Sequence, residues 1–469
     1  MSPRGRAAQR WEHEVSDRRT RGGKRKGWQM GETGAGASGP SGGRNGSPRE
    51  VFTAFLKLGL VSFGGPTAHI GYFRSEFVAR RKWLSDAAFG ELLALCQVLP
   101  GPASSQLGLA IGLRRGGAWG AAAAFLGFTA PSVAIMLGFA LGAEAFDGPL
   151  LRAVTAGLTS VAVAVVAHAV WGMRPALLTG WISWVIAAAA LLLVATWGHP
   201  AAHPAAIACG AAAGWFWHRV HARGARPVEV EPRGGVGGGG RGGVPVWAGI
   251  CALAALLAVL VGPPLMLLAV PGGTGVAAGV AGTEASGGLV GLSSLIDTFA
   301  RAGALVFGGG HAVLPLLESG TVAPGWVAPS DFLAGYGLAQ AVPGPMFSFA
   351  AYLGAISVVG PGGVLGGLIA VVAIFAPGFL LLVGVLPFWN TLRTRPGLDA
   401  AFRGAGAAVM GVLVAALCGP VAAGGLTSWP AAGLAVVTLA LLMLRAPSWA
   451  VVLLGAGAGI GAFALGVSL

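Results

Sequence analysis

Long, unbroken apolar runs dominate this chain and alternate with short polar breaks. Four of the clearest runs are Leu150–Gly172, Ala176–Gly198, Val246–Val270 and Leu365–Trp389. A membrane helix needs about 20 apolar residues to cross roughly 30 Å of hydrocarbon. The runs are continuous and lack the alternation of barrel strands, so helices are the structure that satisfies their backbone in lipid. The pattern predicts an all-α polytopic integral membrane protein.

Two polar segments divide the chain. Residues 1–49 form a basic tail, and residues 1–50 hold eleven Lys and Arg against five Asp and Glu. The second segment, 219–245, is rich in glycine and arginine. Neither has an apolar core, so we expect a disordered tail and a flexible linker, both cytoplasmic. The predicted organisation is tail 1–49, N-terminal membrane repeat 50–218, linker 219–245, and an extra helix with a C-terminal membrane repeat at 246–469.

The two apolar blocks are related by an internal repeat at an offset near 243. FLKLGLVSFGGPTAH at 55–69 matches FARAGALVFGGGHAV at 299–313, and FTAPS at 128–132 matches FAPGF at 375–379. Between these motifs, Trp83 aligns with Trp326, and the tripeptide PGP occurs in both blocks. So many landmarks in register indicate a duplication.

Loop charges predict that the two halves have opposite orientations. Arg74, Arg80, Arg81 and Lys82 follow the first GG motif, whereas the matching segment 311–330 has no Lys or Arg. Basic residues collect on the cytoplasmic side of membranes, so the matching segments should lie on opposite sides. The extra helix near 246–270 supplies the change of direction. Inverted repeats with broken helices are typical of secondary transporters.

The number of membrane crossings depends on how the GG and PGP segments are counted. If they are re-entrant or broken, there are nine full spans, and counting the broken segments gives up to about 13 crossings. The expected full spans are 117–143, 150–172, 176–197, 201–218, 246–270, 364–386, 404–421, 429–444 and 447–467.

The strongest candidate site is the pair of PGP segments, CQVLPGPASSQ at 96–106 and AQAVPGPMFSF at 339–349. Two prolines around a glycine interrupt a helix, and irregular backbone at membrane depth lines a cavity or is buried in protein. The helix that restarts has free N–H groups at its positive end, which favours an anion. A plain packing kink is the alternative. The predicted binding residues here are Gln97, Pro100, Gly101, Pro102, Ser104, Ser105, Gln340, Pro343, Gly344, Pro345 and Ser348.

The GG motifs supply the other candidates. Lys57 and Arg301 occupy matching positions in apolar helices, and an intramembrane cation is by default a functional hypothesis. The alternative is that each side chain extends to the headgroups. Four glycines complete this part of the predicted binding site: Gly64, Gly65, Gly308 and Gly309. Candidates for proton coupling are His69, Glu91 and His311, and a structural or interfacial role is the alternative for the two histidines.

Several motifs are absent from the sequence. It has no G-x-x-x-x-G-K-[ST] phosphate loop, no HExxH, no nucleophile elbow and no metal-type cysteine or histidine spacing. We therefore expect no enzymatic activity, no cofactor and no bound metal. Nothing indicates a nucleic-acid partner, and the expected energy source is an electrochemical gradient.

Taken together, the motifs around the GG and PGP segments resemble the chromate ion transporter family in its long, two-domain form. The resemblance rests on FLKLGLVSFGGPTAHI, RRKWLSDAAFGELLALCQVLPGPASSQLGLAIG and FTAPS, and on GALVFGGGHAVLPLLE, FLAGYGLAQAVPGPMFSFAAYLGA and FAPG. It implies export of chromate across the bacterial plasma membrane, with chromate resistance, and we expect the electrochemical gradient that drives it to be the proton-motive force. Transport of sulfate or another tetrahedral oxyanion, and a passive anion channel, are the alternatives. The expected partners are the oxyanion and the lipid bilayer, and a homo-oligomer is compatible with the sequence.

Overall fold

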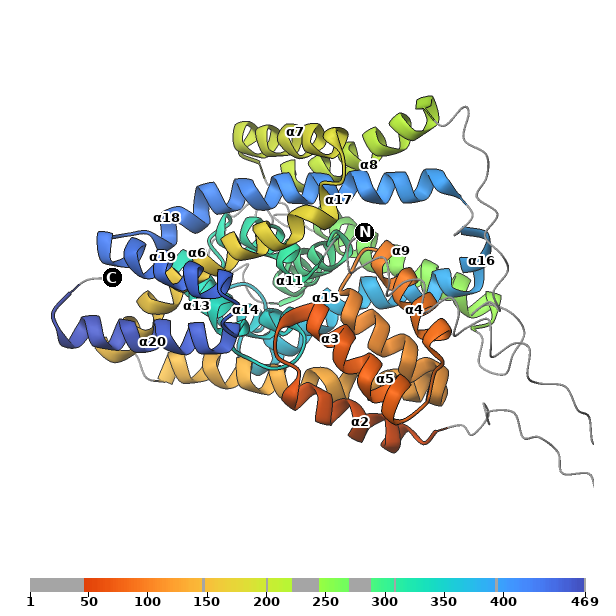
Figure 1. The fold of residues 1–469 in the computed structure, drawn as a ribbon, viewed down its shortest axis with the longest axis horizontal. Helices are drawn as coiled ribbons and strands as arrows, with labels where there is room; N and C mark the ends of the chain where they lie inside the picture. Colours follow the sequence, from red (N-terminus) through yellow and green to blue (C-terminus); the bar gives the residue numbers. More distant parts are fainter. Residues whose placement is uncertain are drawn as a thin grey trace, which may run out of the picture. The chain divides into compact units, whose positions relative to one another are not determined.

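The computed structural model describes residues 46–145, 148–199, 201–221, 244–269, 288–307, 309–392 and 395–467. Every regular element in these ranges is helical, which confirms the predicted fold class (Figure 1). The expectations for the basic tail up to residue 45, for the central part of the linker and for Gly308 lie outside the described residues.

The N-terminal repeat is a series of interrupted helices. Its elements are α2 (Pro48–Val61), α3 (Gly65–Phe73), the π-helical turn η1 (Arg74–Arg80), α4 (Asp86–Val98) and α5 (Ala103–Ala145). Both predicted breaks are present, at the GG motif between α2 and α3 and at the PGP turn between α4 and α5. A third break lies inside α5, where Gly117 has a φ of 64°. Glycine adopts this left-handed backbone without the steric cost that other residues meet.

The second repeat follows the same plan. Its elements are α11 (Gly288–Ala304), η2 (Gly310–Val313), α12 (Leu314–Leu317), η3 (Glu318–Val322), α13 (Pro329–Ala339), η4 (Met346–Ser348), α14 (Phe349–Ile356) and α15 (Gly363–Val385). The GG and PGP breaks recur, and η3 is π-helical like η1. Helix α2 packs on α5 through Gly59, where a Cβ atom would lie 2.7 Å from the Phe128 carbonyl oxygen. Gly303 of α11 meets the Ile374 carbonyl of α15 in the same way.

Each repeat continues into three longer helices, joined in the second repeat by short helical segments, and the residues described between the repeats form one extra helix. These elements are α6 (Pro149–Leu177), α7 (Trp181–Trp197), α8 (Ala202–His221), α9 (Val246–Ala269), η5 (Leu386–Phe388), α16 (Trp389–Leu392), α17 (Pro396–Ala416), η6 (Leu417–Val421), α18 (Ala422–Gly425), α19 (Trp429–Met443) and α20 (Ser448–Ala464). Most of their bounds lie within about five residues of the predicted spans, but α17 begins at Pro396 and not at 404. Helix α9 is the predicted extra helix, packed on α11 and α15.

The later helices of each half pack against helices of the other half. Helix α6 packs against α19 and α20 of the other half, and α17 packs against α7 and α8 (Figure 1). The contacts match residue for residue. A Cβ atom on Gly157 would collide with the Gly455 carbonyl, and one on Gly404 would collide with the Gly210 carbonyl. Small residues allow this close backbone approach in membranes, where lipid tails offer little drive for helices to associate.

Five helical segments of the described residues are long and apolar enough to cross a membrane. They are Ala103–Gly142, Pro149–Leu177, Val246–Leu268, Gly363–Leu392 and Gly397–Gly425. Shorter apolar helices are Trp181–Trp197, Met346–Ile356, Trp429–Met443 and Ser448–Ala464. The total of 9 to 13 crossings stays a prediction.

Candidate functional site

The two PGP turns meet the GG motifs of opposite halves. The Gly101 N–H donates to the Val306 carbonyl at 2.8 Å, and the Gly344 N–H donates to the Ser62 carbonyl at 3.0 Å. Donors and acceptors occupy matching positions, so each half provides its PGP glycine to the loop of the other. A reciprocal pair of this kind is what a twofold relation between the repeats produces.

The backbone conformation and the close packing of both PGP turns require glycine at the central position. Gly101 has a φ of 121° and Gly344 a φ of 104°, in the left-handed region that side chains rarely adopt. There is also little space. A Cβ atom on Gly101 would lie 3.0 Å from the Gly378 Cα atom, and one on Gly344 would lie 3.0 Å from the Ser132 hydroxyl oxygen. Each turn therefore packs directly on the proline-containing helix of the other half.

A buried polar network surrounds the first PGP turn. The imidazole of His69 lies 3.2 Å from the Ser62 carbonyl oxygen through Nε2 and 3.3 Å from the Ser104 Oγ through Nδ1. A carbonyl oxygen can only accept, so Nε2 carries the proton and Nδ1 of a neutral ring accepts from the Ser104 hydroxyl. The edge of the ring packs against Phe128, with centroids 5.2 Å apart.

Helix α5 begins directly after this turn. Its first backbone bond runs from the Gln106 N–H to the Pro102 carbonyl at 2.9 Å, so the N–H groups of the preceding turn point out of the helix start. The Gln106 amide nitrogen donates to the Pro100 carbonyl at 3.0 Å and to the Gly378 carbonyl at 2.9 Å. Gln106 thereby fixes the turn to both halves of the chain.

Four polar atoms near this turn have no hydrogen-bond partner among the described residues. They are the hydroxyl oxygens of Ser62, Ser105 and Thr129 and the amide oxygen of Gln106. All four side chains are buried, with at most 5% of their surface exposed. Ser62, Gln106 and Thr129 are additions to the predicted site. Each belongs to a repeated motif of the sequence, but their burial could not be read from the pattern.

The second PGP turn has a different environment. The Gln340 amide nitrogen lies 2.7 Å from the Met346 sulfur, and His311 Nδ1 lies 2.7 Å from the Tyr336 hydroxyl. A Cβ atom on Gly310 would lie 3.7 Å from the Pro66 ring, which shows that the GG loops of the two halves are close. The structure thus brings together both PGP turns, both GG loops, His69 and Ser104.

The predicted cations lie apart from this buried centre. Lys57 and Arg301 occupy matching places on α2 and α11, and both side chains are exposed. Arg301 is paired with Asp297 one turn earlier, at 2.6 Å between Nε and Oδ1. The sequence could have indicated this partner through its i,i+4 spacing. Gln97 is also exposed and Glu91 is half-buried.

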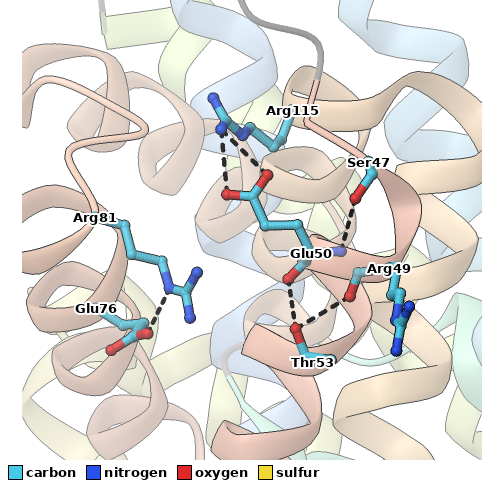
Figure 2. Close-up of polar contacts among 7 residues, drawn as sticks. All are labelled: Ser47, Arg49, Glu50, Thr53, Glu76, Arg81 and Arg115. Atoms are coloured by element: carbon cyan, nitrogen blue, oxygen red, sulfur yellow. Dashed lines mark hydrogen bonds and ion pairs between the residues drawn. The ribbon is translucent and has the colours of Figure 1, made fainter.

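A second polar cluster ties α2 to the break in α5. Figure 2 shows the Arg115 guanidinium facing the Glu50 carboxylate, with Nη2 3.2 Å from both oxygens, and Arg81 bound to Glu76. The Trp83 ring lies 5.0 Å from the Arg115 guanidinium and 5.3 Å from that of Arg81. In the second repeat the matching residues are Val358 and Trp326, and these are joined by a backbone bond from the Val358 N–H to the Trp326 carbonyl at 3.1 Å.

Two repeated helical units that interlock through broken segments define a multi-pass membrane transport protein. Residues 49–215 and 293–460 each match the family described as chromate transporter. This chain belongs to that family, as the sequence motifs predicted.

Curated relatives extend the similarity over most of the chain. It is 30% identical to the chromate transport protein of Pseudomonas aeruginosa, over 78% of this chain and 79% of that protein. It is 26% identical to the chromate transport protein of Cupriavidus metallidurans, over 84% and 88%. A probable chromate transport protein of Synechococcus elongatus is 27% identical, over 79% and 84%. No solved structure matches the chain.

Proposed function

We propose that this protein exports chromate across the bacterial plasma membrane, driven by the proton-motive force, and so confers chromate resistance. The observation that carries this proposal is the reciprocal pair of hydrogen bonds at Gly101 and Gly344, in a family named for chromate transport. A centre built from matching parts of two halves can form equivalent contacts in two arrangements. Alternating access requires two such arrangements, one open to each side of the membrane. The tail and linker are cytoplasmic in this proposal.

The chemistry around the first PGP turn suits an oxyanion. N–H groups at a helix start and serine hydroxyls donate hydrogen bonds, and the helix dipole favours negative charge. Sulfate and other tetrahedral oxyanions share this shape and charge, so they are the competing substrates. Lys57 and Arg301 are proposed to attract the anion. Because Asp297 offsets the charge of Arg301, we expect Lys57 to contribute more.

His69 offers a route for coupling a proton to the anion. In the neutral ring, the Ser104 hydroxyl donates to Nδ1 and cannot donate to a ligand. When Nδ1 is protonated, it would donate to the Ser104 oxygen. The Ser104 O–H would then be free to donate a hydrogen bond at the start of α5. The described ring contacts are all with uncharged groups. The described charged side chains on η1 and α5, the two elements that pack against α3, are Arg74, Glu76, Arg80, Arg114 and Arg115.

Everted membrane vesicles test this function, because export from the cell becomes accumulation in the lumen. Respiring vesicles with the protein should accumulate chromate above the level of empty-vector vesicles. With the membrane potential removed by valinomycin and potassium, a proton-coupled exporter still concentrates chromate, whereas a channel only equilibrates it. The His69→Gln variant should lose the pH dependence that the initial rate shows in wild type. Accumulation of sulfate but not chromate would contradict the substrate, and equilibration alone would contradict active export.

A further inference from the structure

The two PGP turns are alike in backbone but not in side chains. Three of the four unpartnered polar atoms near the first turn are hydroxyl oxygens, which can donate to a ligand: Ser62, Ser105 and Thr129. A buried hydroxyl without a partner is costly, because it has lost its hydrogen bonds to water. Buried groups of this kind are normally completed by an ordered water, an ion or a ligand.

Hydrogen bonds and close packing join the segments that carry these hydroxyls. Ser62 lies on the GG loop, and its carbonyl receives both the His69 Nε2–H and the Gly344 N–H. A Cβ atom on Gly344 would lie 3.3 Å from the Phe128 carbonyl oxygen, directly before Thr129. Ser105 follows Ser104, the hydroxyl partner of His69. The first turn of α5 and its outward N–H groups therefore belong to the same buried region.

The second turn has apolar side chains at nearly every matching position. Ser104 aligns with Phe347 and Gln106 with Phe349. Thr129 aligns with Phe375 when Pro131 and Pro377, the prolines of the two helices, are superposed in the sequence. His69 aligns with Val313 and Ser62 with Val306. The three phenylalanines are at most 3% exposed, so they fill this region. Ser348 is the one hydroxyl retained, and it matches Ser105.

We propose that the oxyanion binds at the N-terminal PGP turn alone, held by the hydroxyls of Ser62, Ser105 and Thr129 and by the first N–H groups of α5. The C-terminal turn is then an apolar counterpart, which provides a packing surface when the two halves change their contacts. Gln106 is a positioning residue, because its amide nitrogen is committed to two carbonyls and its oxygen can only accept. This inference rests on the proposed function, and it reduces two symmetric candidate sites to one.

The matched substitutions Ser105→Ala and Ser348→Ala test the assignment. In proteoliposomes of purified full-length protein, Ser105→Ala should raise the KM for chromate roughly tenfold or more, the usual effect of losing a hydrogen bond to a charged group. Ser348→Ala should keep the KM within about twofold of wild type. Thr129→Val should follow Ser105→Ala, and Ser105→Thr, which restores a hydroxyl, should recover most of the affinity.

The outcomes separate this inference from the proposed function. Equal KM changes in Ser105→Ala and Ser348→Ala, or a change only in Ser348→Ala, would overturn the single-site assignment. A lower melting temperature of Ser105→Ala with an unchanged KM would show that the hydroxyl holds a structural water, and would also overturn it. If wild type transports sulfate or molybdate but not chromate, the substrate of the proposed function fails and the same comparison is made with that anion. If wild type transports no oxyanion, both proposals fail.

Discussion

At the scale of single residues, the centre of the molecule depends on backbone that only glycine adopts easily. Gly101 and Gly344 combine a positive φ with contact to the opposite half, and their N–H groups make the reciprocal bonds. Replacement by any other residue would strain the turn and displace the helix it contacts. The turns therefore join the repeats through backbone that a side chain would disrupt.

Substituting either PGP glycine should damage both folding and transport. Gly101→Ala and Gly344→Ala should each cost about 1–3 kcal/mol from backbone strain, with more from displacement of the neighbouring helix. The melting temperature in detergent and the chromate flux per folded protein measure the effect. Gly138→Ala is the matched control, because a Cβ atom there meets nothing within 4 Å. A Gly101→Ala protein that matches this control in both measurements would show that the turn is not constrained.

The sequence predicted the helix breaks, where a motif determines the backbone conformation. It did not predict which polar side chains are buried without a partner. The prolines and glycines of the PGP and GG motifs predicted the breaks correctly, because ring geometry and φ preference act locally. Ser62 and Thr129 were missed because their isolation from partners depends on tertiary packing. Arg301 is exposed beside Asp297, an arrangement that a count of intramembrane charges does not distinguish from a buried site.

At the scale of elements, glycine pairs determine how the later helices of the two halves cross. Gly459 of α20 meets the Ala153 carbonyl of α6, and Gly214 of α8 meets the Ala400 carbonyl of α17. The sequence could not predict these partner helices, because hydropathy gives the length of a span and not its neighbours.

One face of α20 should therefore tolerate larger residues and the other should not. Gly459→Leu forces α20 away from α6, and we expect loss of most folded protein in the membrane. Gly457→Leu lies on the same helix, where a Cβ atom meets nothing within 4 Å, and should leave the abundance near that of wild type. Size-exclusion profiles of the detergent-extracted protein give the folded fraction. Equal profiles for the two variants would contradict the α6–α20 crossing.

At the scale of the whole molecule, the two repeats differ in their distribution of charged residues, although their backbones match. The α3–α4 region of the first repeat contains Arg74, Arg80, Arg81 and Lys82, and its ion pairs include Arg81 with Glu76 (Figure 2). The matching region of the second repeat has no Lys or Arg from 311 to 330. Reciprocal contacts indicate a twofold relation, but they leave the direction of its axis open. The charge difference supports an axis in the membrane plane, which inverts one half relative to the other.

The inverted arrangement is the central claim, and cysteine labelling from each side of the membrane tests it most directly. Ala87 and Ser330 are matched, exposed residues in the first turns of α4 and α13. Each is replaced by cysteine in a protein whose Cys96, Cys209, Cys251 and Cys418 have been removed. In intact cells, a membrane-impermeant maleimide should label Ser330→Cys and not Ala87→Cys, and in everted vesicles the reactivities should reverse. Labelling of both positions from the same side would contradict the inversion.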